Sequence, residues 1–302
     1  MIASPRAPQE RASDRFPQPI EIPEDELEHP RLSTIGKLVR NTIALLFHDP
    51  TGMILGSAFL LLMLWGFHGG VDVLGVVWKG WTGPGSSADP SRARIIPGIP
   101  WDQEWISFGI GAVLLVVIPC VLITRVFKQR LRDYGLGLPR RERWGLTALS
   151  ALVLAVIGFP GIYLGAHGNT SIRATYPLYR AFTSDAQFWI YELGYFVFFV
   201  VIEFIFRGYL LFGLFHAQRA RGGEPDARPA RRPITFGYYA IFVSMLSYTA
   251  WHLGKPVPEL WSTLAWGVLA GTIALATETI WHIVIVHWAI NVFMDLVIWK
   301  GW

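Results

Sequence analysis

Apolar runs about 20 residues long recur along the chain, and they constrain its fold more than any other feature. A helix of that length crosses the roughly 30 Å hydrocarbon layer of a bilayer, where only helices and closed barrels satisfy their own backbone. Only 16% of the residues are charged, against about 25% in soluble domains. We therefore expect an all-α, polytopic membrane bundle of about seven to eight transmembrane helices. The expected spans cover residues 52–69, 105–126, 145–165, 187–215, 235–253, 259–277 and 280–299.

The charges of the loops predict the orientation of these spans. Lys and Arg gather before the first expected span, after the second and after the fourth, whereas the other loops hold fewer. Because positive residues accumulate in cytoplasmic loops, we expect a multi-pass protein of the cell (inner) membrane with a cytoplasmic N-terminus. These loops also explain the net charge of +4, so no nucleic-acid partner is expected. The single cysteine, Cys120, excludes an intrachain disulfide and a cysteine-type zinc site.

Changes in composition divide the chain into three parts. Residues 1–40 begin with proline-rich, charged sequence that has no signal-peptide core, and we expect a disordered cytoplasmic tail. Residues 41–128 are expected to hold an interfacial helix and the first two spans. An external loop rich in Pro, Gly and Ser, at residues 80–102, separates these two spans. Residues 129–302 are expected to form the core of the bundle.

The stretch IEFIFRG places Glu203 and Arg207 inside a strongly apolar run. A charged residue at the bilayer centre costs about 2.5–3.5 kcal/mol on insertion scales, so something must offset it. The two residues are four apart, share a helix face and can pair. Glu192 precedes Glu203 by about three turns with about 20° of drift. The three residues therefore predict either a structural ion pair or a polar cavity along this helix.

Two later spans carry polar residues at helical spacing. The fifth expected span ends in SYTAWH, where Tyr248 and His252 are four residues apart. The last contains HWAIN, where His287 and Asn291 share a face. Asp295 follows Asn291 by one turn and is expected to contact it. The chain thus presents a carboxylate, two imidazoles and an amide from three separate apolar helices.

This constellation is compatible with two kinds of hydrolytic chemistry. In one, the side chains bind a divalent metal, with zinc expected. In the other, a glutamate and a histidine polarise water directly, while the asparagine and the second histidine stabilise an oxyanion. The expected ligands in the metal case are His252, His287, Glu203 and Asn291.

The order of these motifs resembles that of the CPBP intramembrane proteases, which include CAAX prenyl endopeptidases and bacterial bacteriocin-processing or Abi proteins. The family pattern EExxxRG, FxxxH and HxxxN appears here as IEFIFRG, YTAWH and HWAIN. The resemblance covers about residues 130–300 and implies that residues 129–302 form an intramembrane protease core. It also implies a protein or peptide substrate, cleaved at a CAAX-like C-terminus or in a leader or sorting segment.

In one position the chain departs from this family pattern. The family's first glutamate, assigned to activating water, is Ile202 here. Neighbouring helix positions differ by about 100°, so three hypotheses follow. Glu203 takes the role in a shifted site, Glu192 supplies the carboxylate, or the scaffold has lost hydrolysis. The catalytic residues that the resemblance implies are Glu203, Arg207, His252, His287 and Asn291, with Glu192 as the further candidate.

Two other classes of function stay open. A catalytically degenerate scaffold would act as a membrane binding or immunity protein, and the missing glutamate favours it. A small-solute or ion transporter ranks lower, because the sequence shows neither an internal repeat nor paired broken helices.

Overall fold

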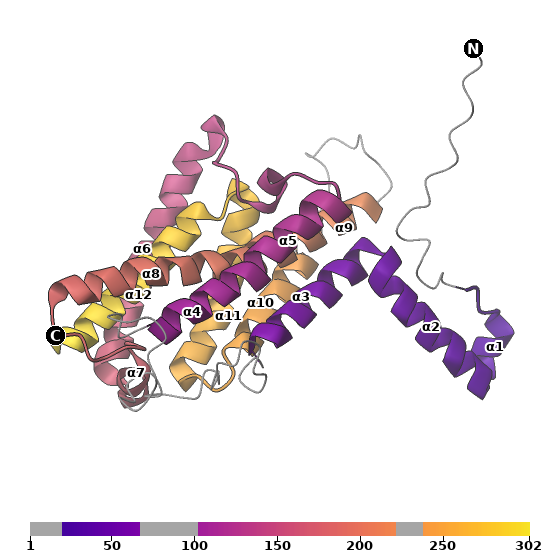
Figure 1. The fold of residues 1–302 in the computed structure, drawn as a ribbon. Helices are drawn as coiled ribbons and strands as arrows, with labels where there is room; N and C mark the ends of the chain where they lie inside the picture. Colours follow the sequence, from indigo (N-terminus) through magenta and orange to yellow (C-terminus); the bar gives the residue numbers. More distant parts are fainter. Residues whose placement is uncertain (1–19, 67–101, 222–237) are drawn as a thin grey trace, which may run out of the picture. The chain divides into compact units, whose positions relative to one another are not determined.

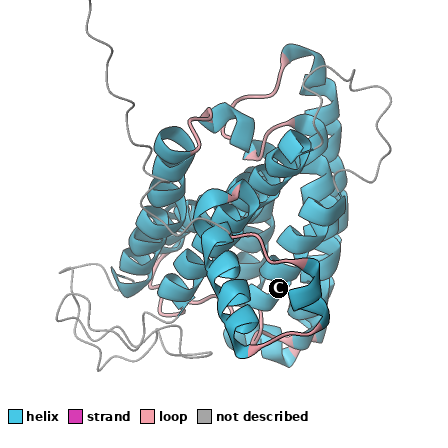
Figure 2. Cartoon of the chain, turned by 90° about the vertical axis from the view of Figure 1, so that its right-hand side faces the viewer, coloured by secondary structure: helices cyan, strands magenta, loops and turns pink. Residues whose placement is uncertain are grey.

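The computed structural model describes residues 20–66, 102–221 and 238–302, and every regular element in these ranges is a helix (Figures 1 and 2). Two compact units, residues 1–57 and 58–302, are described separately. The helices are α1 (Glu24–Glu28), α2 (Leu32–His48), α3 (Pro50–Gly66), α4 (Asp102–Ala112), α5 (Ile118–Val121), α6 (Trp144–Gly168), α7 (Thr170–Thr175), α8 (Asp185–Glu203), α9 (Gly213–Arg221), α10 (Tyr238–Trp251), α11 (Val257–Thr277) and α12 (Trp281–Lys300). Segments of π-helix are η4 (Val113–Val117), η5 (Leu122–Val126) and η8 (Phe204–Phe212), and 3₁₀ turns are η6 (Leu131–Tyr134) and η7 (Arg141–Arg143).

The unit of residues 1–57 departs from the predicted disordered tail. Helix α2 begins at Leu32, although the tail was expected to be disordered to residue 40. Its start is held by Thr34, whose hydroxyl accepts from the Arg31 amide at 3.1 Å. An ion pair of 2.6 Å joins Lys37 to Glu26 of α1. These contacts, together with the absence of proline between residues 31 and 49, explain why helix begins earlier than composition alone predicts.

The predicted helical membrane bundle is confirmed, whereas the number of spans is not fixed. Five helical stretches are long and apolar enough to cross a membrane, or six if the bent pair α2–α3 counts as one. They coincide with five expected spans. The expected spans at 52–69 and 235–253, and nearly all of the expected 80–102 loop, reach outside the described residues. The qualifying stretches are Trp105–Val126, Arg141–Gly168, Asp185–Ala217, Val257–Thr277 and Trp281–Lys300.

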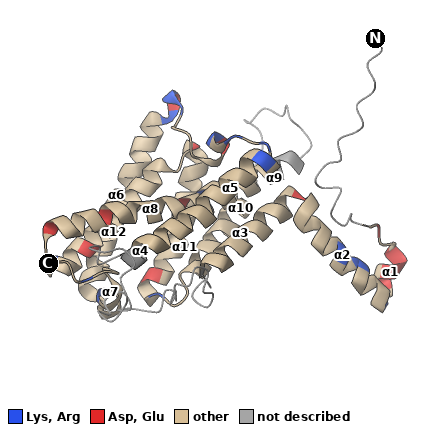
Figure 3. Ribbon diagram, in the orientation of Figure 1, with Lys and Arg blue, Asp and Glu red and all other residues tan. Residues whose placement is uncertain are grey.

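The span that contains α8 is the most enclosed of the five. Of its most apolar window 89% is buried inside the protein, against 17% for the span that contains α6. Helix α8 packs against α4 and α12, and its continuation η8 packs against α10. In the unit of residues 58–302, Lys and Arg gather near helix ends and the helix bodies are mostly uncharged (Figure 3). Polar side chains on α8 therefore face protein instead of lipid.

A short turn sets where α12 begins. Helix α11 stops because Glu278 takes a left-handed conformation with φ of 59°. The chain then restarts as helix at Trp281. Backbone carbonyls of residues 135–137 accept four hydrogen bonds from this turn: Ile280 N–H to Gly135 at 3.0 Å, Thr279 Oγ1 to Gly137 at 2.8 Å and to Gly135 at 3.4 Å, and Trp281 Nε1 to Leu136 at 3.0 Å.

Candidate active site

The IEFIFRG motif lies where α8 changes from α-helix to π-helix. Helix α8 ends at Glu203, and η8 begins with Phe204. Gly208 allows close packing, because a Cβ there would collide with the Phe204 ring and lie 3.1 Å from the Tyr134 carbonyl. Single π-turns inside helices occur frequently at functional sites. Here the π-turn follows directly after the motif glutamate.

The carboxylate of Glu203 is fully buried and meets polar groups from two other helices as well as its own. Nδ1 of His287, on α12, lies 2.6 Å from Oε1. Nε1 of Trp266, on α11, donates to the same oxygen at 3.3 Å. The Nε atom of Arg207 lies 3.4 Å from Oε2. Oε1 of Glu203 is thus held by two side chains at hydrogen-bond distance, and Oε2 faces the guanidinium of Arg207 as an ion pair.

Two partners offset the buried charge of Arg207. One is Glu203, four residues earlier, as the spacing predicts. The other is the ring of Tyr248 on α10, whose centroid lies 3.9 Å from the guanidinium carbon. A desolvated cation over an aromatic face gains about 2 kcal/mol or more. The ion pair and the ring together explain how this segment accommodates a guanidinium.

His287 is oriented by its surroundings. Its ring lies 4.8 Å from the ring of Phe199 and 4.8 Å from that of Trp266, measured between centroids. Since Nδ1 faces Glu203, Nε2 is the nitrogen that can meet a ligand. The side chain is 20% exposed, whereas that of Glu203 is 0% exposed.

His252 follows α10 directly and is oriented in a similar way. Its Nδ1 donates to the Tyr248 carbonyl at 2.8 Å, and its ring lies 4.5 Å from the Tyr248 ring. This assigns the proton of the neutral ring to Nδ1 and leaves Nε2 as an acceptor. The ring of Tyr248 also lies 6.5 Å from that of His287. Tyr248 therefore connects the two motif histidines.

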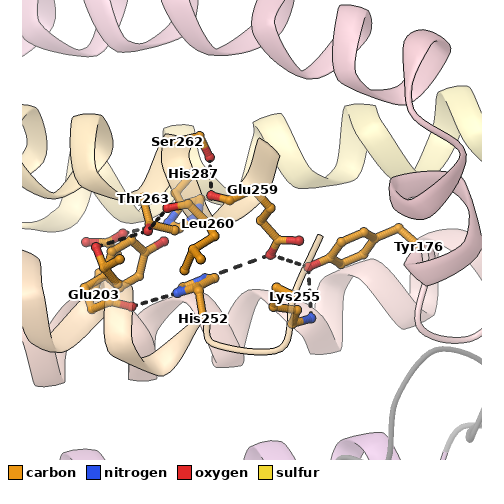
Figure 4. A network of polar contacts seen from close by, with 11 residues as sticks. Tyr176, Glu203, His252, Lys255, Glu259, Leu260, Ser262, Thr263 and His287 are labelled. Carbon is orange, nitrogen blue, oxygen red and sulfur yellow. Dashed lines mark hydrogen bonds and ion pairs between the residues drawn. The ribbon is translucent and has the colours of Figure 1, made fainter. Parts of the chain in front are cut away.

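Glu259, in the first turn of α11, is a site residue that the sequence analysis did not identify. Its Oε1 lies 4.0 Å from Nε2 of His252. The hydroxyl of Tyr176 donates to the same oxygen at 2.7 Å, and Nζ of Lys255 donates to that hydroxyl at 3.0 Å. Figure 4 shows this network with His252 and Glu259 between Glu203 and Tyr176. In the sequence, Glu259 is marked only as a single acidic residue that follows HLGKPVP at the start of an apolar helix.

Tyr176 and Lys255, which form the network around Glu259, lie outside the membrane spans, and burial shifts the pKa of each. It raises the pKa of Tyr176, so the phenol remains a hydrogen-bond donor at neutral pH. It lowers the pKa of Lys255 to about 8, with the nearby Glu259 opposing that change. The charge of Lys255 is therefore partly lost just above neutral pH.

Asn291 and Glu192 both meet Asp295 on α12. Nδ2 of Asn291 donates to Asp295 Oδ2 at 3.2 Å, the contact expected from their spacing. The carboxyl of Glu192 lies near that of Asp295 and interacts with it electrostatically. Neither oxygen of Glu192 has a hydrogen-bond partner among the described residues. Glu192 and Glu203 thus both face α12, Glu203 at His287 and Glu192 at Asp295, eight residues further on. Glu192 therefore does not contact the motif histidines.

The predicted metal ligands do not form one cluster. Among the described residues there is no group of three or more His, Cys, Asp or Glu side chains that could hold a metal ion. Nδ1 of His287 points at Glu203, and the Asn291 amide donates to Asp295. His252 instead faces Glu259. These donors do not converge on one point as a tetrahedral zinc site requires.

The comparisons with known proteins bear on the same helices. Residues 184–293 match the model of a family described as type II CAAX prenyl endopeptidase Rce1-like. The matched segment contains all three motifs, and it confirms the resemblance to the CPBP proteases predicted from them. No curated protein and no solved structure matches the chain.

Proposed function

We propose that this chain, whose residues 184–293 match the model of the Rce1-like family of type II CAAX prenyl endopeptidases, is a membrane-embedded endopeptidase that cleaves near a membrane-anchored C-terminus. The family supports a membrane protease, and the peptide specificity is our inference. The observation that carries the proposal is the pair of oriented histidines. Each fixes Nδ1 on an acceptor inside the protein, at 2.8 Å for His252 and 2.6 Å for His287. Each therefore directs Nε2 toward a reactant.

The two histidines suit different parts of peptide hydrolysis. His252 accepts a hydrogen bond from the attacking water through Nε2. The Glu203 carboxylate stabilises positive charge on the His287 ring. The protonated His287 then donates from Nε2 to the oxyanion that forms on the substrate carbonyl. Asn291 keeps a second amide N–H beside the one that binds Asp295, and this N–H is the other oxyanion donor. Arg207 keeps Glu203 ionised through its positive charge.

His252→Ala and His287→Ala test this assignment. Removing a general base or an oxyanion donor lowers rates by about 10²–10⁴-fold. We expect such losses in the cleavage of a quenched-fluorescent, farnesylated peptide ending in Cys-aliphatic-aliphatic-X by protein purified in detergent. His167→Ala is the matched control, because His167 is exposed at the end of α6 and contacts the Tyr163 carbonyl of its own helix. Wild-type cleavage by both site variants would refute the proposal.

Zinc binding stays a separate prediction. Elemental analysis of the purified protein, before and after a chelator, measures it directly. Stoichiometric zinc that disappears in both His252→Ala and His287→Ala would establish the metal site. Metal-free protein that retains its full cleavage rate would establish the metal-free mechanism.

A non-catalytic membrane binding or immunity protein is the second candidate. Ile202, where the family has its first glutamate, is 2% exposed and lies in an apolar environment. A scaffold without a carboxylate that can activate water would bind a peptide without cutting it. The distinction between the two functions therefore depends on whether another carboxylate occupies that role.

A further inference from the structure

The carboxylates on α8 are poorly placed to activate water. Glu203 and Glu192 are both 0% exposed. The oxygens of Glu203 face His287, Trp266 and Arg207, and the carboxyl of Glu192 faces Asp295. A general base must lie within hydrogen-bonding reach of the proton that it removes. Neither glutamate combines an available oxygen with access to a substrate.

We propose that Glu259 is the general base of the reaction and that it acts together with His252. This inference rests on the proposed peptidase function. The carboxylate of Glu259 comes from α11, and its Oε1 lies 4.0 Å from Nε2 of His252. Their side chains are 19% and 14% exposed, so both reach the surface that a substrate would approach. Together they supply a carboxylate and an imidazole in the absence of a glutamate at residue 202.

The separation of these two atoms suits one shared water molecule. A water with hydrogen bonds of about 2.8 Å to each acceptor would subtend about 90° between them. That angle is close enough to the H–O–H angle for both protons to be held at once. The lone pairs of the oxygen then face away from the two acceptors, toward an incoming carbonyl carbon.

Tyr176 and Lys255 position the carboxylate. The Tyr176 hydroxyl donates to Oε1 at 2.7 Å, and Lys255 donates to Tyr176 at 3.0 Å. Oε2 is buried and has no hydrogen-bond partner among the described residues. A buried acceptor without a partner costs free energy, so Oε1 is the oxygen that fixes the carboxylate and takes the proton from the shared water, through its second lone pair. Tyr176 and Lys255 are thus positioning residues in this scheme.

The step balances without a further reactant. Water gives one proton to the Glu259 carboxylate, and its oxygen forms a bond to the peptide carbonyl carbon, whose π electrons move onto oxygen. The tetrahedral intermediate re-forms the carbonyl and breaks the C–N bond. The leaving amine takes the proton back from Glu259. A carboxylic acid and an amine remain, and Glu259 is ionised again. The acid then loses the second proton of the water to the amine or to solvent.

The test compares Glu259→Gln with Glu203→Gln, using the full-length protein and the same farnesylated peptide. We expect Glu259→Gln to lower kcat by about 10²–10⁴-fold. Glu203→Gln should also lower kcat, since it removes the charge that orients His287. Glu142→Gln, in the exposed turn η7, is the matched control. Glu259→Asp should recover part of the rate, and Tyr176→Phe should lower kcat more than it changes KM.

The outcomes separate this inference from the proposed function. Full activity of folded Glu259→Gln, with His287→Ala inactive, overturns the role of Glu259 alone. No cleavage by the wild-type protein of any CAAX peptide or membrane-anchored leader peptide contradicts the peptidase function, and the base role with it. Should Glu259→Gln fail to fold, as judged by gel filtration, Glu259→Asp and Tyr176→Phe decide. Wild-type kcat in both variants overturns the inference.

Discussion

Glu203 and Glu259 each face a histidine, the first from α8 toward α12 and the second from α11 toward the end of α10. Glu203 is fully buried, with a guanidinium and an indole against its two oxygens. Glu259 is 19% exposed and is held by a tyrosine hydroxyl through one oxygen only. The comparison separates two tasks that a motif glutamate can perform. A carboxylate enclosed by a guanidinium and an indole holds helices together and orients its histidine, whereas a partly exposed one can exchange a proton.

The largest expected effect follows from breaking the enclosed pair. Arg207→Met leaves the Glu203 charge buried without its guanidinium, and removing one partner of such a pair costs about 3–5 kcal/mol. Lys255→Met is the comparison and should cost less, because the burial that disfavours its ammonium offsets the loss of its hydrogen bond to Tyr176. Denaturation in mixed micelles measures both values. Equal losses of unfolding free energy in the two variants would show that Glu203 and Glu259 do not differ in how strongly they depend on a neighbouring cation.

Adding a carboxylate at residue 202 comes next. Ile202 is 2% exposed, and an unpaired charge buried there costs several kcal/mol, on the order of 3. If Glu259 is the base, Ile202→Glu should destabilise the protein and leave kcat unchanged or lower. Ile202→Gln is the control for size and polarity. A clear gain in cleavage by Ile202→Glu would show instead that the natural chain is a degenerate protease.

The pH dependence of stability sharpens the description of the open site. Burial lowers the pKa of Lys255 to about 8, against the usual 10.5, so the folded protein binds this proton more weakly than the unfolded chain does. Below about pH 8 Lys255 is protonated in both states, and the folded protein bears the full cost of the buried ammonium. The free energy of unfolding should therefore rise between about pH 8 and 10, as the folded protein loses this proton. Thermal melts at pH 7 and 9.5 measure this, and Lys255→Met should flatten the difference. A flat wild-type profile would count against burial of the ammonium.

The smallest effect is expected at Glu192. Glu192→Gln removes a buried carboxyl whose oxygens have no hydrogen-bond partner among the described residues, and its amide can donate to the nearby Asp295. The free energy of unfolding should therefore change by less than about 1 kcal/mol. Cleavage should stay within about twofold, because Glu192 does not contact the motif histidines. Loss of activity in this variant would identify Glu192 as the carboxylate that serves the reaction, in place of Glu259.

The sequence predicts the bundle better than it predicts the site. Apolar runs and charge at helical spacing are local properties, which is why α11 and α12 lie within two residues of their expected bounds. The pairing of Glu203 with Arg207 follows from the same periodicity. Glu259 reaches His252 across a turn that contains Gly254 with φ of 90°, and helical periodicity does not extend through such a turn. The change to π-helix after Glu203 is set by tertiary packing and has no comparable local pattern.

The hydrogen bonds between residues 135–137 and the α11–α12 turn have a consequence for biosynthesis. Donor and acceptor in these hydrogen bonds are separated by as many as 145 residues along the chain. The carbonyls of residues 135–137 therefore cannot meet their donors until the ribosome has made all of the intervening helices. At about 5–20 residues per second, that synthesis takes roughly ten seconds. His287 and Asn291 lie beyond the turn, on a helix whose start those carbonyls fix. A nascent chain therefore cannot bring His287 and Asn291 beside His252 until α12 has been synthesised and the α11–α12 turn has met residues 135–137.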